Sequence, residues 1–175
     1  MQAILDRPEL PARRRFDVAA YYRMADTGIL APEDRVELID GEIVEMAPIG
    51  SAHSGTTNRL TGLVGRLASD GRVVASVQSP LRLDPFNEPQ PDLMLLRPRP
   101  DDYTTSHPIA ADVLLLIEVA DSSLAFDRGP KLALYARHAV REVWIVDLVG
   151  RAVEVCRGPG PEGYAERRRL TEGVL

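Results

Sequence analysis

Eight residues decide the fold of this chain: Val113-Leu114-Leu115-Leu116-Ile117-Glu118-Val119-Ala120, its most apolar run. The run lacks the alternation of apolar and polar residues that a half-exposed strand shows, so it predicts a central strand covered on both faces. Near its far end stands a carboxylate, and a charged group is almost never fully buried unless it is paired or binds a metal. We therefore take Glu118 as the first candidate site residue.

A second apolar run carries a carboxylate near its start. Pro91 opens this run, where its missing N–H does no harm, and Asp92 follows directly before four apolar residues. If the two strands lie side by side, Asp92 and Glu118 converge and resist ionisation unless a cation joins them. Oxygen ligands favour Mg²⁺ or Mn²⁺, and the carbonyl of Val119 is a further candidate ligand. Histidine and cysteine are too sparse for a convincing zinc site.

A lysine follows the second of these strands. The pattern predicts a helix from about residue 129 or 130 to His138, with Lys131 in its first turn, where Pro130 is tolerated. Helical side chains lean toward the helix N-terminus, so the Lys131 ammonium is expected to reach over the strand end. There it is placed to orient a water and to offset charge on a phosphoryl group. The trio predicts metal-assisted hydrolysis of a phosphodiester by a metal-held water.

The rest of the chain predicts one mixed α/β sheet flanked by helices. Asp40-Gly41 between two alternating runs predicts a hairpin, in which Glu37 has a surface position by base rate alone. Residues 1–15 are expected to form a flexible N-terminal arm and residues 16–175 a single domain. The other expected helices cover residues 17–27 and 51–70, the second packing Leu60, Leu63, Val64 and Leu67 on the sheet. The other expected strands cover residues 72–79 (continued by 81–83), 142–147, 151–156 and 164–169.

Bulk properties exclude several classes of protein. The 175 residues suit one domain, and the net charge of -5 argues against coating of DNA in the manner of a histone. A single cysteine, Cys156, excludes a disulfide framework and fits a reducing cytoplasm. The polar start of the chain is unlike a signal peptide, and no apolar run approaches the roughly 20 residues of a membrane helix. We expect a soluble cytoplasmic protein with no membrane association.

An ordered set of motifs between Phe16 and Cys156 resembles one known family. The set comprises Val36 to Glu42, His53, Pro91-Asp92, Ile117 to Ser123, Asp127 to Leu132, Tyr135-Ala136 and Val143 to Asp147. It resembles the Uma-type family of bacterial restriction endonucleases, within the PD-(D/E)xK nuclease superfamily. The resemblance implies a restriction-endonuclease-like core and Mg²⁺-dependent cleavage of DNA.

The resemblance also implies roles for individual residues. It places metal-binding carboxylates at Asp92 and Glu118 and adds Glu37 as a further acidic member of the site. In the superfamily pattern the lysine stands two residues after the glutamate, where this chain has Ala120. The family it resembles shares this gap, and its lysine corresponds to Lys131 on the helix.

Alternative functions and roles remain open. An endonuclease acting as a homodimer on DNA is favoured by the trio of Asp92, Glu118 and Lys131. A non-catalytic binding module with the same fold is favoured by Ala120 and by the acidic net charge. A third reading is another phosphoesterase acting on RNA or nucleotides. Asp127 is interpreted as a helix cap or as a partner of Lys131, and a lone histidine such as His53 as a surface or capping residue.

Overall fold

A six-stranded mixed sheet forms the body of the molecule, in a computed structural model that describes residues 13–171. Its strand order is β3-β4-β5-β6-β7-β8, and only β5 and β6 run parallel. The strands are β3 (Val74–Val77), β4 (Leu93–Leu96), β5 (Val113–Ala120), β6 (Glu142–Asp147), β7 (Ala152–Gly160) and β8 (Gly163–Thr171). The mixed α/β fold expected from the sequence is confirmed.

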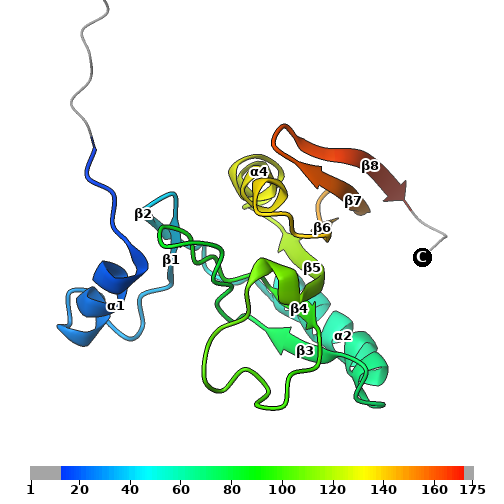
Figure 1. Cartoon of the computed structure of the whole chain (residues 1–175). Coiled ribbons are helices and arrows are strands. Elements are labelled where there is room, and N and C mark those ends of the chain that lie inside the picture. The colour runs from blue at the N-terminus through cyan, green and yellow to red at the C-terminus, as the bar shows by residue number, and fades with distance from the viewer. Residues whose placement is uncertain (1–12, 172–175) are drawn as a thin grey trace, which may run out of the picture.

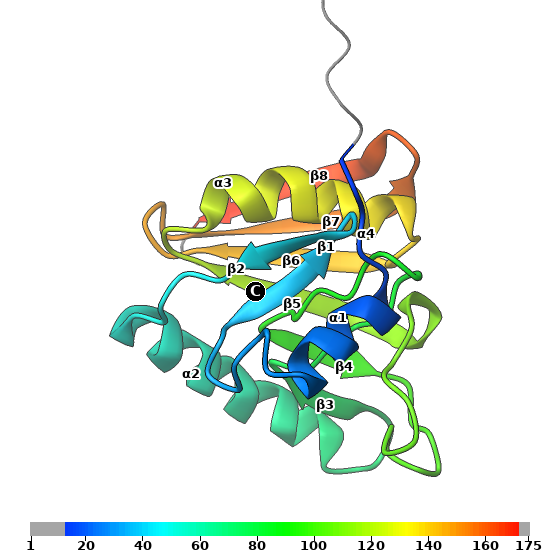
Figure 2. The same cartoon turned by 90° about the vertical axis from the view of Figure 1, so that its left-hand side faces the viewer.

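Helices cover the two faces of the sheet, as Figures 1 and 2 show. On one face lies α2 (Ser51–Ala68), whose Val64 packs against Leu93, Leu95 and Ile117. On the other face lies a continuous helical stretch made of α3 (Leu124–Phe126), a π-helical turn η2 (Asp127–Lys131) and α4 (Leu132–Arg137). The central strand β5 is therefore covered on both faces, which explains why all of its residues except Glu118 are apolar.

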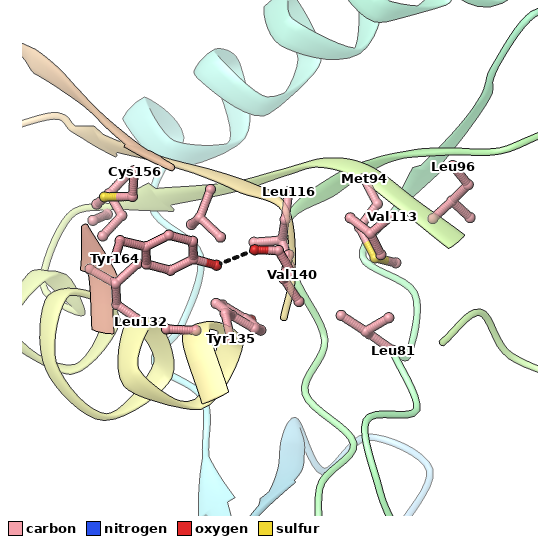
Figure 3. Packing of buried hydrophobic residues seen from close by; sticks show 14 residues of the cluster. Leu81, Met94, Leu96, Val113, Leu116, Leu132, Tyr135, Val140, Cys156 and Tyr164 are labelled. Atoms are coloured by element: carbon pink, nitrogen blue, oxygen red, sulfur yellow. Dashed lines mark hydrogen bonds between the residues drawn. The ribbon is translucent and has the colours of Figure 1, made fainter. Parts of the chain in front are cut away.

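The larger core cluster lies between α4 and the sheet (Figure 3). Tyr135 of α4 is fully buried there together with Leu116 of β5. Tyr164 of β8 contributes its ring to the same cluster and donates a 2.7 Å hydrogen bond from its hydroxyl to the carbonyl of Val140. Burial of a phenol with its hydroxyl paired anchors the end of the sheet to the chain segment that follows α4.

The helix α2 presents a narrower apolar face to the sheet than its sequence suggests. Leu60 and Val64 pack against the sheet, but Leu63 and Leu67 are 44% and 58% exposed. The expectation that all four residues pack on the sheet is therefore wrong for Leu63 and Leu67. Leu60 and Val64 are four residues apart and share one line along the helix, whereas Leu63 and Leu67 lie on the next line.

A separate hairpin stands beside the sheet, next to α1 (Val18–Asp26) (Figure 1). It consists of β1 (Val36–Ile39) and β2 (Glu42–Glu45), and its turn residues Asp40 and Gly41 have φ values of 52° and 77°. Positive φ at both positions is typical of the type I′ turn predicted from Asp-Gly. The N–H of Glu88 donates to the Leu38 carbonyl at 2.8 Å and joins the hairpin to the body.

Three sequence-based boundaries need correction. Residues 81–83 do not continue β3, because only an isolated bridge joins Arg82 to Ile109. The helical stretch over the sheet begins at Leu124, so Lys131 lies well inside it and not in its first turn. β7 and β8 extend past the expected strand ends at residues 156 and 164 to a tight turn between Gly160 and Gly163.

The ends of the chain fall partly outside the described residues. Of the arm predicted over residues 1–15, the structure describes only residues 13–15, of which Arg13 contacts Glu42 at 3.1 Å. Residues 172–175 of the predicted domain also lie outside this range. Within residues 13–171, no helix has the length and apolar character needed to cross a membrane.

Candidate active site

The two carboxylates predicted from the apolar strands lie next to each other. The antiparallel register pairs Leu93 of β4 with Ile117 of β5, so Asp92 falls opposite Glu118. The backbone N–H of Asp92 donates to Oε2 of Glu118 at 3.4 Å. Both side chains are almost fully withdrawn from solvent, with residue exposures of 8% for Asp92 and 3% for Glu118. Two acids in such surroundings need positively charged or hydrogen-bonding partners.

Glu118 receives its partners from the helical stretch above the sheet. The Lys131 ammonium lies 2.9 Å from Oε1 of Glu118, and the Tyr135 hydroxyl donates to the same oxygen at 2.6 Å. Lys131 and Tyr135 stand four residues apart and therefore reach the same side of the helix. Oε1 is thus bound by two side chains of the protein, and Oε2 is the oxygen that faces Asp92.

Lys131 also binds the third acid of the predicted site. Its Nζ lies 3.2 Å from Oε2 of Glu37, which in turn accepts the backbone N–H of Gln90 at 3.1 Å. Glu37 is only 3% exposed, so the expectation that it lies at the surface is wrong. It reaches the site because β1 as a whole is largely buried. Lys131 therefore ties the hairpin to β5 through two buried ion pairs.

The composition of the chain, as well as its motifs, points to Lys131 as a special residue. The chain has 21 basic residues of the Lys and Arg types, and Lys131 is its only lysine. An ammonium is a compact point charge, whereas a guanidinium is a wide planar fork. A lysine at this position of an otherwise arginine-only chain fits a site in which one compact cation contacts two carboxylates.

The π-helical turn sets the position of Lys131. The N–H of Leu132 donates to the carbonyl of Asp127, five residues earlier, and Pro130 lies inside the turn without an N–H of its own. π-turns occur frequently at functional sites. Asp127 lies in mid-helix and does not cap it, contrary to one interpretation of the sequence. Its Oδ2 accepts the Ser123 hydroxyl at 2.6 Å.

Asp92 is held by a different set of donors. Its Oδ2 accepts the backbone N–H of Val119 at 2.8 Å and contacts Nε2 of His53 at 3.1 Å. Its Oδ1 accepts the side-chain amide of Gln78 at 3.3 Å. The interpretation of His53 as a surface or capping residue is therefore wrong, because its ring is turned inward onto Asp92. Gln78 is a second contact that the sequence did not identify.

Burial and charge act in opposite directions on the ionisable groups of the site. Burial raises the pKa of Glu118 to about 8, although the neighbouring Lys131 opposes this shift. Burial alone would lower the pKa of Lys131, but the charges of Glu118, Glu37 and Asp127 outweigh it and raise that pKa. Lys131 is consequently an ammonium at neutral pH and cannot serve as a general base. Burial and the nearby carboxylates also hold the pKa of Tyr135 well above its ordinary value.

One cavity of about 320 Å³ brings the predicted residues together. Its lining includes Glu37, Asp92, Glu118, Val119, Lys131 and His53. The segment from Met46 to Gly50, which links β2 to α2, forms another wall together with Phe126. His138, at the end of the helix, lies 3.4 Å from Asp84 and is not part of the cavity lining.

The donor set of the cavity fits a hard divalent cation. Asp92 and Glu118 offer carboxylate oxygens, the ligand type that Mg²⁺ and Mn²⁺ prefer. Among the described residues, no group of three or more His, Cys, Asp or Glu side chains is arranged to hold a metal ion. Two carboxylates completed by water and substrate oxygens is the usual way in which proteins hold Mg²⁺. Zinc, which needs three or four protein ligands, fits this site poorly.

A family model for the Uma2 family, described as "Putative restriction endonuclease", matches residues 18–175. The chain belongs to the Uma2 family. No curated protein matches it. Among solved structures, it is similar to the crystal structure of a putative nuclease of DUF820 from Anabaena variabilis. The two share 17% sequence identity and a TM-score of 0.62, over 84% of this chain and 83% of the other. This likeness establishes a shared fold.

In this Uma2 family member, the lysine beside Glu118 lies on the helical stretch and not on β5. Ala120, two residues after Glu118, is fully buried in β5 and has no polar side chain to offer. Lys131 nevertheless places its Nζ 2.9 Å from Glu118. Although Ala120 departs from the superfamily pattern, the chain still places a lysine ammonium near the two carboxylates.

Proposed function

We propose that the protein is a Mg²⁺- or Mn²⁺-dependent endonuclease that hydrolyses phosphodiester bonds of DNA. The observation that carries the proposal is the convergence of Asp92, Glu118 and Lys131 in one cavity. Membership of a family described as "Putative restriction endonuclease" and a fold shared with a protein described as a "putative nuclease" support it. The buried pair of carboxylates is otherwise costly to fold, which favours a functional reason for its presence.

Each residue of the trio has a separate role. Asp92 and Glu118 would hold the divalent cation, with Glu118 contributing Oε2 because Oε1 is bound by Lys131 and Tyr135. The carbonyl of Val119, at the end of the same strand, is the further protein ligand that we propose. A bound divalent cation supplies charge stabilisation at a phosphoryl oxygen and lowers the pKa of a water molecule.

Lys131 and Glu37 would act beside the cation. Because Lys131 stays an ammonium, it stabilises negative charge that develops on the phosphoryl group and does not remove a proton. Glu37 positions the ammonium through its 3.2 Å ion pair. We place Glu37 as a positioning residue for Lys131.

A nicking assay with purified protein tests the proposal. Supercoiled plasmid is incubated with Mg²⁺, Mn²⁺ or EDTA, and the open-circle and linear products are quantified. We expect cleavage with either cation and none with EDTA, Asp92→Ala or Glu118→Ala. Full activity in either variant would refute the site assignment. Linear product with paired cuts in the two strands would support a homodimer, which sedimentation equilibrium measures directly.

A non-catalytic binding module is the second candidate. It is favoured by Ala120 and by the fact that the carboxylate oxygens of Asp92 and Glu118 accept hydrogen bonds within the protein. Calorimetry separates it from the first candidate, because a module without cation chemistry takes up no Mn²⁺. Cleavage of RNA or of nucleotides in place of DNA in the same assay would identify the third class of function, another phosphoesterase.

A further inference from the structure

The donors around Asp92 differ in charge from those around Glu118. Glu118 faces the positive charge of Lys131 at 2.9 Å. Asp92 accepts a backbone N–H, a side-chain amide and an imidazole nitrogen. Glu118 is therefore in contact with a cation of the protein, whereas the contacts of Asp92 among the described residues are hydrogen-bonding groups.

The imidazole of His53 has one nitrogen available as a donor to Asp92. His53 lies in the first turn of α2, its side chain is 15% exposed, and its Nδ1 is buried without a hydrogen-bond partner among the described residues. A proton on Nδ1 would bury an unpaired donor, which is unfavourable. The geometry therefore favours Nε2 as the nitrogen that donates to Oδ2 of Asp92.

Gln78 reaches Asp92 through an unusual backbone conformation. It is a non-glycine residue with a φ of 45°, at the bend that ends β3. Its backbone N–H donates to the carbonyl of Asp92 at 3.1 Å and its side-chain amide to Oδ1 at 3.3 Å. Left-handed conformations are unfavourable for residues with a Cβ and tend to be retained at functional sites. The bend brings two donors of a single residue onto Asp92.

We propose that His53 and Gln78 are positioning residues for Asp92. Together they fix the plane of its carboxylate from two elements, α2 and the end of β3, and leave its negative charge to a divalent cation. The inference rests on the proposed function, because it assigns Asp92 as a ligand of that cation. Partners of this kind, outside the ligands themselves, typically change metal affinity by about 10–100-fold when they are removed.

Mn²⁺ affinity, measured by titration calorimetry, tests the two residues. His53→Leu and Gln78→Gly should each weaken Mn²⁺ binding about 10–100-fold. His53→Gln should stay close to the wild type, because its amide nitrogen replaces Nε2 as a donor to Asp92. A His53→Gln protein that binds as weakly as His53→Leu would overturn the role of the Nε2 donor.

Thermal unfolding without metal separates positioning from a structural role. Glycine adopts a φ of 45° without strain, so Gln78→Gly should not lower the melting temperature. Ala139→Gly is a matched control, since Ala139 has a φ of 59° but lies beyond α4 and outside the cavity lining. We expect Ala139→Gly to keep wild-type Mn²⁺ affinity.

The outcomes distinguish this inference from the function on which it rests. Wild-type Mn²⁺ affinity in both His53→Leu and Gln78→Gly would overturn the positioning roles and leave the proposed nuclease intact. The positioning roles would also be overturned if Gln78→Gly bound Mn²⁺ more weakly and at the same time had a lower melting temperature. A wild-type protein that binds no Mn²⁺ would overturn the proposed function and this inference together.

Discussion

At the scale of single residues, the buried ion pairs of Lys131 have the largest expected effect on stability. Lys131→Met leaves Glu37 and Glu118 as buried carboxylates without their cation. Removing one partner of a buried pair typically costs about 3–5 kcal/mol of unfolding free energy. We expect a loss of this size at pH 8, measured by urea denaturation.

The loss from Lys131→Met should shrink at low pH. Burial raises the pKa of Glu118, so at pH 5 the folded variant takes up a proton there and no longer buries that charge. The exposed pair of Arg72 and Asp70 supplies a control, because Arg72→Met removes only a solvent-screened contact. Equal losses at pH 5 and pH 8 would contradict the assignment of the cost to unpaired carboxylates.

The hydroxyl of Tyr135 orients Glu118, and a second buried tyrosine provides a matched comparison. Tyr135→Phe removes the 2.6 Å bond to Glu118, and Tyr164→Phe removes the 2.7 Å bond to Val140. Both should lower the unfolding free energy, by about 1.5–3 kcal/mol where the acceptor is charged and about 1 kcal/mol where it is a carbonyl. Only Tyr135→Phe should also weaken Mn²⁺ binding. A similar effect of Tyr164→Phe on Mn²⁺ would show that the measurement reports stability alone.

Cation binding should depend on pH through Glu118. Because burial raises its pKa to about 8, Glu118 carries a proton below that pH and a cation must displace it. Mn²⁺ affinity is therefore expected to rise from pH 6 to pH 8 and to level off above it. Calorimetry in buffers of different ionisation enthalpy counts the released proton. Glu118→Gln should release none, and pH-independent binding by the wild type would contradict the prediction.

The site residues divide by how their positions are encoded. Asp92 and Glu118 could be located from sequence because each is a lone carboxylate in an apolar run, and strand pairing brings such residues together. His53 and Gln78 could not, because their contacts depend on how α2 crosses the sheet and on one backbone angle. Local sequence patterns contain neither of these quantities.

At the scale of elements, the hairpin β1–β2 matters because it carries Glu37 to Lys131. Its turn residue Gly41 has a φ of 77°, and a Cβ there would lie 2.6 Å from Cβ and 3.2 Å from Cα of Arg15. Gly28 has a φ of 74° with nothing within 4 Å of an added Cβ. Gly28→Ala should therefore cost about 1–2 kcal/mol from backbone conformation alone, and Gly41→Ala clearly more. Equal losses in urea denaturation would show that the contact with Arg15 relaxes freely.

The bounds of an element were predicted well where its residue pattern is uniform and poorly where glycine or proline interrupts that pattern. Seven of the eight residues of β5 are apolar, and its observed bounds match the predicted run. The helical stretch starting at Leu124 was expected only from Gly129 or Pro130, because glycine and proline side by side read as a helix start. A π-turn allows the helix to continue through Pro130, and helical periodicity does not reveal a π-turn.

At the scale of the whole molecule, cation binding should stabilise the fold. A ligand that binds only the folded state at 100 times its dissociation constant adds about 2.7 kcal/mol of unfolding free energy. For a domain of this size that corresponds to a rise in melting temperature of roughly 5–10 °C. Differential scanning fluorimetry with Mn²⁺ and EDTA measures it, and Asp92→Asn should abolish the rise. A rise that persists in Asp92→Asn would place the cation elsewhere.

The architecture was predictable because it follows from the burial of β5, but the arrangement of the hairpin was not. A helix on each face of a mixed sheet is the natural way to cover an apolar central strand. The hairpin forms its own two-stranded sheet, and its place depends on Glu88 and Lys131, which are distant in sequence. Such long-range polar contacts have no local sequence signal.

Because the chain has a single lysine, the rate at which that lysine is chemically modified can report a local opening of the structure. Amine-acylating reagents have one side-chain target here, and that target is 4% exposed and pinned between Glu37 and Glu118. Acylation of Lys131 therefore requires the hairpin to separate transiently from the helix, so its rate relative to that of a free lysine gives the free energy of this local opening. Mass spectrometry can follow that opening in the intact protein without any mutation, and a bound cation or nucleic acid that closes the cavity should slow it.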